Sequence, residues 1–181
     1  MTEKEQADVV LSRKAFFVRC CLWVGDSMND EEIMRLALAE AQKAYDIDEV
    51  PIGAVVVKDG TVVGRGYNRR ETGKNALYHA ELAAIDEACR NLGGWRLWQC
   101  ELFVTLEPCP MCAGAIINSR LKRIVYGCSD PKAGSVRSVI NLFELPYNHK
   151  PEVVGGVLAE ECSAMLSDFF RELRKRKKEA P

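Results

Sequence analysis

The stretch LFVTLEPCPMCAGAIINSRLKRIVYG, residues 102–127, has the pattern of a strand, a helix and a second strand. Apolar residues fill 102–106 and 123–127, and helical spacing covers 111–119 between them. Two strands joined by a crossover helix within about 25 residues form a parallel unit, which is right-handed in nearly all folds. The sequence therefore predicts a sheet with a parallel part and a helix packed on it.

The elements before this unit are predicted by helical spacing and by a tight turn. Residues 30–45 place apolar side chains at the spacing of an amphipathic helix. Asp59-Gly60 separates two apolar runs, 52–58 and 61–66, and this dipeptide suits the positive φ angles of a two-residue hairpin turn. We therefore expect a helix followed by an antiparallel hairpin.

Three further elements complete the predicted order. Residues 79–91 have helical spacing that ends at Gly93-Gly94, the valines of 153–158 indicate a short strand, and 163–178 is predicted as a terminal helix. The order helix, hairpin, helix, strand, helix, strand, strand, helix predicts a mixed sheet between helices. The fold class is therefore α/β.

Length and composition fit one globular domain with an extension before it. The 181 residues are 48% hydrophobic and carry a formal net charge of −1, which gives no overall electrostatic reason to expect a nucleic-acid partner. Residues 1–27 show no convincing period, so we place the functional domain at 28–181 and interpret the extension as a disordered arm or an overlong choice of start codon. The charge is uneven, because residues 171–178 hold six basic residues and one acid.

Cysteine usage and hydropathy indicate a reduced, cytoplasmic compartment. A chain with long apolar runs does not need its eight cysteines as a disulfide scaffold. We recognise no secretory signal, and the apolar run at 15–24 is too short to span a bilayer and contains Arg19. No membrane partner is expected. In such a compartment a close cysteine pair is more often metal-binding or catalytic than structural.

His79, with Glu81 two residues later, and Cys109, with Cys112 three residues later, each stand where a predicted helix begins. Cysteines at i and i+3 share a helix face, and a helix N-terminus stabilises thiolate. One histidine nitrogen and two thiolates suit Zn²⁺ and leave the fourth tetrahedral position open for water, which is the catalytic pattern. A carboxylate in the first helical turn can border the same cavity and transfer protons there.

The cysteine pair alone is weakly informative, and a thioredoxin-type redox pair is the alternative at Cys109 and Cys112. A redox motif needs no distant His-x-Glu, however. His-x-Glu followed about 26 residues later by Pro-Cys-x-x-Cys is the signature of zinc nucleobase deaminases. The combined pattern therefore predicts deamination chemistry, but it is shared by deaminases of several bases and does not define the substrate.

From about Met28 to Lys178 the chain resembles the bacterial tRNA-specific adenosine deaminases, a branch of the cytidine deaminase-like zinc enzymes. This resemblance implies a three-layer α/β/α fold around a mixed, mainly five-stranded sheet. The stretches that carry it are Glu49–Val55, Gly66–Asn68, His79–Leu82, Asn91–Leu97, Val104–Ala115, Asp130–Lys132, Asn148-His149 and Leu166–Arg171. Asn148-His149 and the last stretch, with the basic tail after it, favour the tRNA branch.

The resemblance also implies roles for individual residues. His79, Cys109 and Cys112 would hold one zinc ion per subunit, and Glu81 would be the proton shuttle in the hydrolytic conversion of the wobble adenosine of a tRNA anticodon to inosine. Asn68 would contact the target nucleotide, with Val55, Leu106 and the backbone of Ala80 around the flipped base. The residues implied near the anticodon stem-loop are Asp130, Lys132, Asn148, His149, Phe169, Phe170 and Arg171. A homodimer is implied as well.

Other interpretations stay open. Phe169 and Phe170 are core residues by default, although two adjacent aromatic side chains on a helix cannot both face inward. Asp130 has the alternative of capping the loop before Pro131, and Glu107 is expected to be structural. With the same zinc chemistry the chain could be a free-base or nucleotide deaminase of the guanine or cytosine type. A catalytically dead binding subunit is a third possibility, against which the presence of Glu81 argues.

Overall fold

The parallel unit predicted over residues 102–127 lies inside the sheet. In the computed structural model, which describes residues 28–179, β3 (Cys100–Leu106) and β4 (Arg123–Cys128) pair in parallel, and α4 (Pro110–Ser119) connects them. These three elements are confirmed, and β3 begins two residues earlier than predicted. The predicted extension over residues 1–27 lies outside the described residues.

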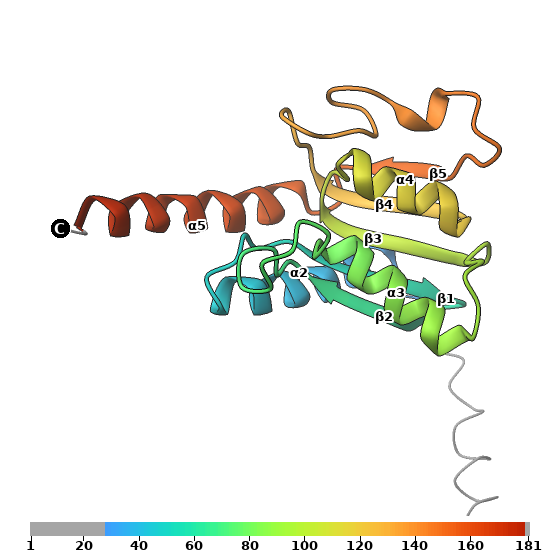
Figure 1. Cartoon of the computed structure of the whole chain (residues 1–181), viewed down its shortest axis with the longest axis horizontal. Coiled ribbons are helices and arrows are strands. Elements are labelled where there is room, and N and C mark those ends of the chain that lie inside the picture. The colour runs from blue at the N-terminus through green and yellow to red at the C-terminus, as the bar shows by residue number, and fades with distance from the viewer. Residues whose placement is uncertain (1–27, 180–181) are drawn as a thin grey trace, which may run out of the picture.

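The hairpin forms the other half of the sheet. β1 (Gly53–Lys58) and β2 (Thr61–Tyr67) pair antiparallel, and the turn residues Asp59 and Gly60 have φ angles of 49° and 74°, as the Asp-Gly turn requires. β1 also pairs antiparallel with β3, so the strand order is β2-β1-β3-β4-β5 (Figure 1). The sheet is therefore mixed, as predicted.

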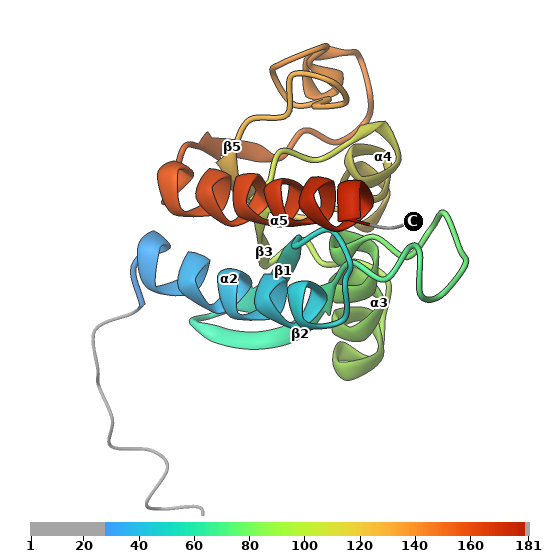
Figure 2. The ribbon, with the colours of Figure 1, turned by 90° about the vertical axis from the view of Figure 1, so that its left-hand side faces the viewer.

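Helices cover both faces of this sheet. α2 (Asp30–Asp46) lies on one side, together with α5 (Ala159–Glu179), and α3 (Ala80–Leu92) lies with α4 on the other (Figure 2). Each pair of helices buries its own apolar cluster against the strands. The three-layer α/β/α architecture is confirmed. None of the described helices combines enough length with enough apolar character to cross a bilayer.

The C-terminal third differs from the prediction in its boundaries. β5 (Glu152–Gly155) is shorter than the predicted strand, because the backbone turns through positive φ at Gly156 and Leu158. α5 therefore begins at residue 159, four residues before the predicted start. A 3₁₀ turn, Leu142–Glu144, was not predicted; the side chain of Asn141 caps it by accepting from the backbone N–H of residue 143.

Candidate metal centre and active site

The candidate metal ligands meet where the two helices on one face of the sheet begin. His79 is the N-cap residue of α3, Cys109 is the N-cap residue of α4, and Cys112 lies one turn further along. Neither N-cap side chain makes a capping hydrogen bond. The imidazole and the thiol are therefore available to each other rather than to the helix backbone.

The spacing of the three ligand atoms fits a zinc ion. Nδ1 of His79 lies 3.7 Å from Sγ of Cys109 and 3.6 Å from Sγ of Cys112. In a tetrahedral site with ordinary Zn–N and Zn–S bond lengths, nitrogen and sulfur are separated by about 3.6 Å. Within residues 28–179, no fourth His, Cys, Asp or Glu joins this cluster, so the fourth coordination position is left for water or substrate.

The protonation of the two thiols is strongly coupled. Hydrogen bonds from Cys112 and then His79 lower the pKa of Cys109 to about 4, although burial opposes this. The hydrogen bond to Cys109, together with burial, raises the pKa of Cys112. The metal-free pair therefore shares one proton between two sulfurs, and a metal ion that binds both as thiolates must displace that proton.

Glu81 lies in the same cavity although it is only two residues from His79. An i, i+2 pair inside a helix diverges, but His79 has the extended backbone of an N-cap residue and Glu81 is in the first turn. Both side chains border a cavity of about 190 Å³. The carboxyl of Glu81 is buried, and this desolvation raises its pKa.

Two buried carboxylates hold the backbone around this cavity. Glu49 accepts hydrogen bonds from the amide nitrogen of Asn68 at 3.2 Å and from the backbone N–H of Thr72 at 2.6 Å. Glu107 accepts from the backbone N–H groups of the segment after β4, at Asp130, Val136, Arg137 and Ser138. The structural role predicted for Glu107 is thus matched by its contacts, whereas Glu49 has a role that no local sequence pattern indicates.

Comparison with known proteins gives this geometry a family. Residues 28–174 match the MafB19-like deaminase family. The tRNA-specific adenosine deaminase of Bacillus subtilis is 55% identical over 152 residues, which cover 83% of this chain and 94% of that relative. The chain belongs to the tRNA-specific adenosine deaminase family.

Solved structures agree with this assignment. A structure from work on A-to-I editing by tRNA:A34 deaminases at the wobble position is 46% identical in sequence and superposes with a TM-score of 0.71. The match covers 74% of this chain and 97% of the solved chain. The guanine deaminase of Bacillus subtilis is 31% identical, with a TM-score of 0.55 and coverages of 82% and 95%. The fold is thus shared with free-base deaminases, and the sequence is more similar to the tRNA branch.

In this family member, three of the predicted substrate contacts border the cavity, namely Asn68, Leu106 and Asp130. The amide nitrogen of Asn68 donates to Glu49 Oε2 and to the carbonyl oxygen of Val50, both at 3.2 Å. The side-chain oxygen of Asn68, Oδ1, is therefore the atom left to accept a hydrogen bond from a ligand. Asp130 lines the cavity and also caps its loop, because Oδ1 accepts from the backbone N–H of Lys132 at 2.9 Å. The side chain of Lys132 is exposed.

The side chains of Val55 and Ala80 are not placed around the cavity. Val55 is fully buried in the cluster under α2, on the sheet face away from α3 and α4. Val50 and Ile52, which sequence reasoning did not select, line the cavity instead. The methyl group of Ala80 is buried in the opposite cluster, and only its backbone lies between two lining residues.

Asn148 and His149 lie far from the cavity within one chain. Nε2 of His149 donates to the carbonyl oxygen of Leu121 at 2.7 Å, and Leu121 follows the C-terminal end of α4. The cavity is at the N-terminal end of this ten-residue helix, about 15 Å away along its axis. Their predicted position near the anticodon loop stays a prediction, and within one chain they are remote from the cavity.

The aromatic pair of α5 is divided between core and surface. Phe169 is 2% exposed and packs edge-to-face on Tyr45 with 5.5 Å between ring centroids, whereas Phe170 is 40% exposed. The expectation that only one of the two faces inward is confirmed. Arg171 is exposed and pairs with Asp168, one turn earlier on the same helix.

We expect Glu107→Gln to destabilise the chain by about 2 kcal/mol at pH 7, because several buried N–H groups lose a charged acceptor. Burial raises the pKa of Glu107, but hydrogen bonds, first from Ser138, outweigh it and the net pKa is lowered. The contribution of ionised Glu107 to the free energy of unfolding is therefore present above the unfolded-state pKa, near 4.5. It is lost as the pH falls through the folded-state pKa. Urea unfolding at pH 7 and below pH 4.5 measures it. Exposed Glu160 supplies the control, Glu160→Gln, and equal stability of the two variants would contradict the role of Glu107.

Proposed function

We propose that this chain deaminates the wobble adenosine of a tRNA anticodon to inosine by hydrolysis. The observation that carries the proposal is the cluster of His79, Cys109 and Cys112 beside the buried carboxyl of Glu81. Sequence similarity supports tRNA as the substrate, because the relative with 55% identity is a tRNA-specific adenosine deaminase. The proposed domain is residues 28–181.

The chemistry divides between the metal and the protein. Zinc held by His79, Cys109 and Cys112 would supply a Lewis acid that brings the pKa of its bound water close to neutrality. Glu81 would take one proton from the attacking water and deliver it to N1 of adenine as the water oxygen bonds to C6. It would then move the second proton of that oxygen to the amino group, so that the C6–N bond breaks and ammonia leaves. The raised pKa of its buried carboxyl suits a group that must accept and release a proton near neutral pH.

The rest of the cavity would bind and orient the nucleotide. The carbonyl oxygen of Asn68 is available as a hydrogen-bond acceptor, since its amide nitrogen is engaged by Glu49 and Val50. Leu106 and Ile52 supply apolar walls that exclude water from the base. An anticodon loop is already single-stranded, so turning one base into the cavity costs only a few kcal/mol.

The C-terminal helix suits an RNA partner. α5 extends past the end of the sheet at which α3 and α4 begin (Figure 1), and its last turns carry the basic residues Arg174, Lys175, Arg176, Lys177 and Lys178. Phe170 presents an exposed ring on the same helix. Cationic side chains bind phosphates and an exposed aromatic ring stacks on bases. Phe170, Arg171 and the exposed Lys132 are therefore proposed to contact the anticodon stem-loop; Phe169 is a core residue.

Parallel incubations test the proposed reaction. The zinc-loaded chain is given an anticodon stem-loop with adenosine at the wobble position and, separately, free guanine, cytosine and adenosine. We expect mass spectrometry to find inosine in the RNA, and none in a matched stem-loop with guanosine at that position. Ammonia released from a free base, with the RNA unchanged, would replace the proposal by the guanine- or cytosine-type alternative. The 31% identity to a guanine deaminase makes that the second candidate.

We also propose that the chain is a cytoplasmic homodimer with one zinc ion per subunit. The segment between β4 and β5 exposes large apolar side chains, among them Val139 at 59% and Tyr147 at 49%, which supports an association surface. The six cysteines of the described residues are free thiols, which fits a reducing compartment. Sedimentation analysis of the zinc-loaded chain tests the dimer.

A further inference from the structure

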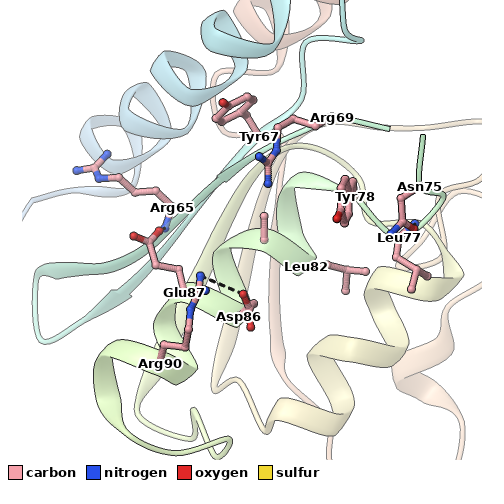
Figure 3. Close-up of a pocket in the computed structure, with 11 residues that line it drawn as sticks. Arg65, Tyr67, Arg69, Asn75, Leu77, Tyr78, Leu82, Asp86, Glu87 and Arg90 are labelled. Atoms are coloured by element: carbon pink, nitrogen blue, oxygen red, sulfur yellow. Dashed lines mark hydrogen bonds and ion pairs between the residues drawn. The ribbon is translucent and has the colours of Figure 1, made fainter. Parts of the chain in front are cut away.

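A second cavity, of about 340 Å³, lies on the outer side of the active-site wall, between β2, α3 and the loop that joins them (Figure 3). Neighbouring residues face the two cavities alternately. Asn68 and His79 border the active site, whereas Tyr67 and Tyr78, the residues just before them, border the second cavity. Adjacent side chains of an extended backbone point to opposite sides, so the wall between the cavities is one backbone thick.

The same wall carries an arginine on each side. Arg70 borders the active site, and Arg69 points into the second cavity between the rings of Tyr67 and Tyr78 (Figure 3). The guanidinium carbon of Arg69 lies 5.5 Å from both ring centroids, and its backbone N–H donates to the carbonyl oxygen of Tyr78 at 3.0 Å. The two aromatic rings therefore hold the guanidinium in place.

The other two arginines of this cavity are already paired. Arg90 pairs with Asp86 at 3.0 Å, and the side chain of Arg65 pairs with Glu40 at 3.3 Å. The carboxylate of Glu87 accepts the backbone N–H of Arg65 at 2.7 Å. Across residues 28–179, no carboxylate lies within ion-pair distance of Arg69. Its positive charge is therefore available to an anion.

The mouth of the cavity presents an aromatic face. Tyr78 is 42% exposed and its neighbour Leu77 is 57% exposed. The ring of Tyr78 packs on the backbone of Gly73 so closely that a Cβ at Gly73 would lie 2.3 Å from Cδ2 of the ring. The loop and the guanidinium of Arg69 thus each cover part of the ring, and the exposed remainder is open to a ligand.

The geometry points to a binding site for a nucleotide that flanks the target adenosine in the same RNA strand. A guanidinium matches the oxygens of a phosphate, and a tyrosine ring stacks on any base. A strand that places one nucleotide in the active site has its neighbour within reach across a wall one backbone thick. This inference rests on the proposed RNA-directed function.

Steady-state kinetics on the anticodon stem-loop test the inference. Arg69→Gln is expected to raise KM roughly tenfold, because a charge-assisted contact to phosphate is lost, and to leave kcat within about twofold. The slope of log kcat/KM against log salt should fall by about 0.7, the value for one phosphate contact in a single strand. Tyr78→Ala should also raise KM roughly tenfold, while Tyr78→Phe, which keeps the ring, should not. The matched control is Arg90→Gln, in the same cavity but already paired with Asp86, and its KM should be unchanged.

Abasic substitution of the RNA identifies the occupant. Stem-loops are made with an abasic nucleotide at each position that flanks the wobble adenosine. One of them should raise KM for the wild-type chain but cause no further increase in KM for Tyr78→Ala, because both changes remove the same stacking contact. If the KM increases from Tyr78→Ala and from the abasic nucleotide were fully additive at every flanking position, the inference would be overturned. It would also be overturned if the wild-type chain were active and both Arg69→Gln and Tyr78→Ala kept the wild-type KM. A fall in kcat at constant KM would show that the wall only supports the active site. Inactivity of the wild-type chain on this RNA would instead overturn the proposed function itself.

Discussion

Glu81→Gln is expected to lower kcat by about a thousandfold or more and to leave zinc binding and the fold intact. Glutamine has the shape of glutamate but cannot accept and return a proton, so the variant loses the general acid–base contribution, which is worth about 10²- to 10⁴-fold by itself. Glu81 lies outside the cluster formed by His79, Cys109 and Cys112, so the metal should remain. The carboxyl is buried and desolvated, and a neutral amide at this position should not reduce the free energy of unfolding.

Two measurements separate this role from a structural one. Zinc content by elemental analysis and the unfolding midpoint should both match the wild-type chain, while single-turnover conversion of the stem-loop should be nearly absent. Glu31→Gln is the matched control, because Glu31 is an exposed glutamate paired with Arg35 on α2. Turnover of Glu81→Gln within tenfold of the wild type would contradict the assignment of Glu81 as the proton shuttle.

The His-Cys-Cys cluster could be predicted from the sequence because its determinants are local. An N-cap residue and a cysteine one turn into a helix have nearly fixed relative positions, so the motif around Cys109 defines half of the site by itself. The other half depended on the motif around His79 standing at the start of a second helix on the same sheet face. The hairpin turn at Asp59-Gly60 was equally local.

Where the other candidate residues lie depends on long-range packing, which no local pattern shows. Every residue from Gly53 to Val57 of β1 is buried, so the strand lacks the polar alternation that would show which face Val55 occupies. The position of His149 depends on a hydrogen bond to Leu121, 28 residues earlier. The partners of Glu49 are likewise 19 and 23 residues away, and no local pattern distinguishes it from a surface glutamate.

Cys112→Ala is the second change expected to have a large effect, on metal binding first and on activity as a result. The variant keeps only His79 and Cys109 as ligands, and two ligands hold zinc poorly where a catalytic site needs three. Loss of partners that only orient ligands already costs about 10- to 100-fold in affinity, so loss of a ligand should cost more. We expect substoichiometric zinc after dialysis against a weak chelator, and no detectable inosine.

The metal-free protein gives a second readout of the same pair. In the wild-type chain the hydrogen bond from Cys112, more than that from His79, keeps the pKa of Cys109 near 4. Without Cys112 that pKa should rise, so alkylation of Cys109 at pH 6, followed by peptide mass spectrometry, should slow as its thiolate fraction falls. Cys100→Ala is the control, because Cys100 is 1% exposed at the start of β3 and has no part in the cluster, so this variant loses similar core packing. A Cys112→Ala protein that retains full zinc would show that the sulfur of Cys112 is not a ligand. Equal zinc loss in Cys100→Ala would show that lost core packing, rather than a lost ligand, releases the metal.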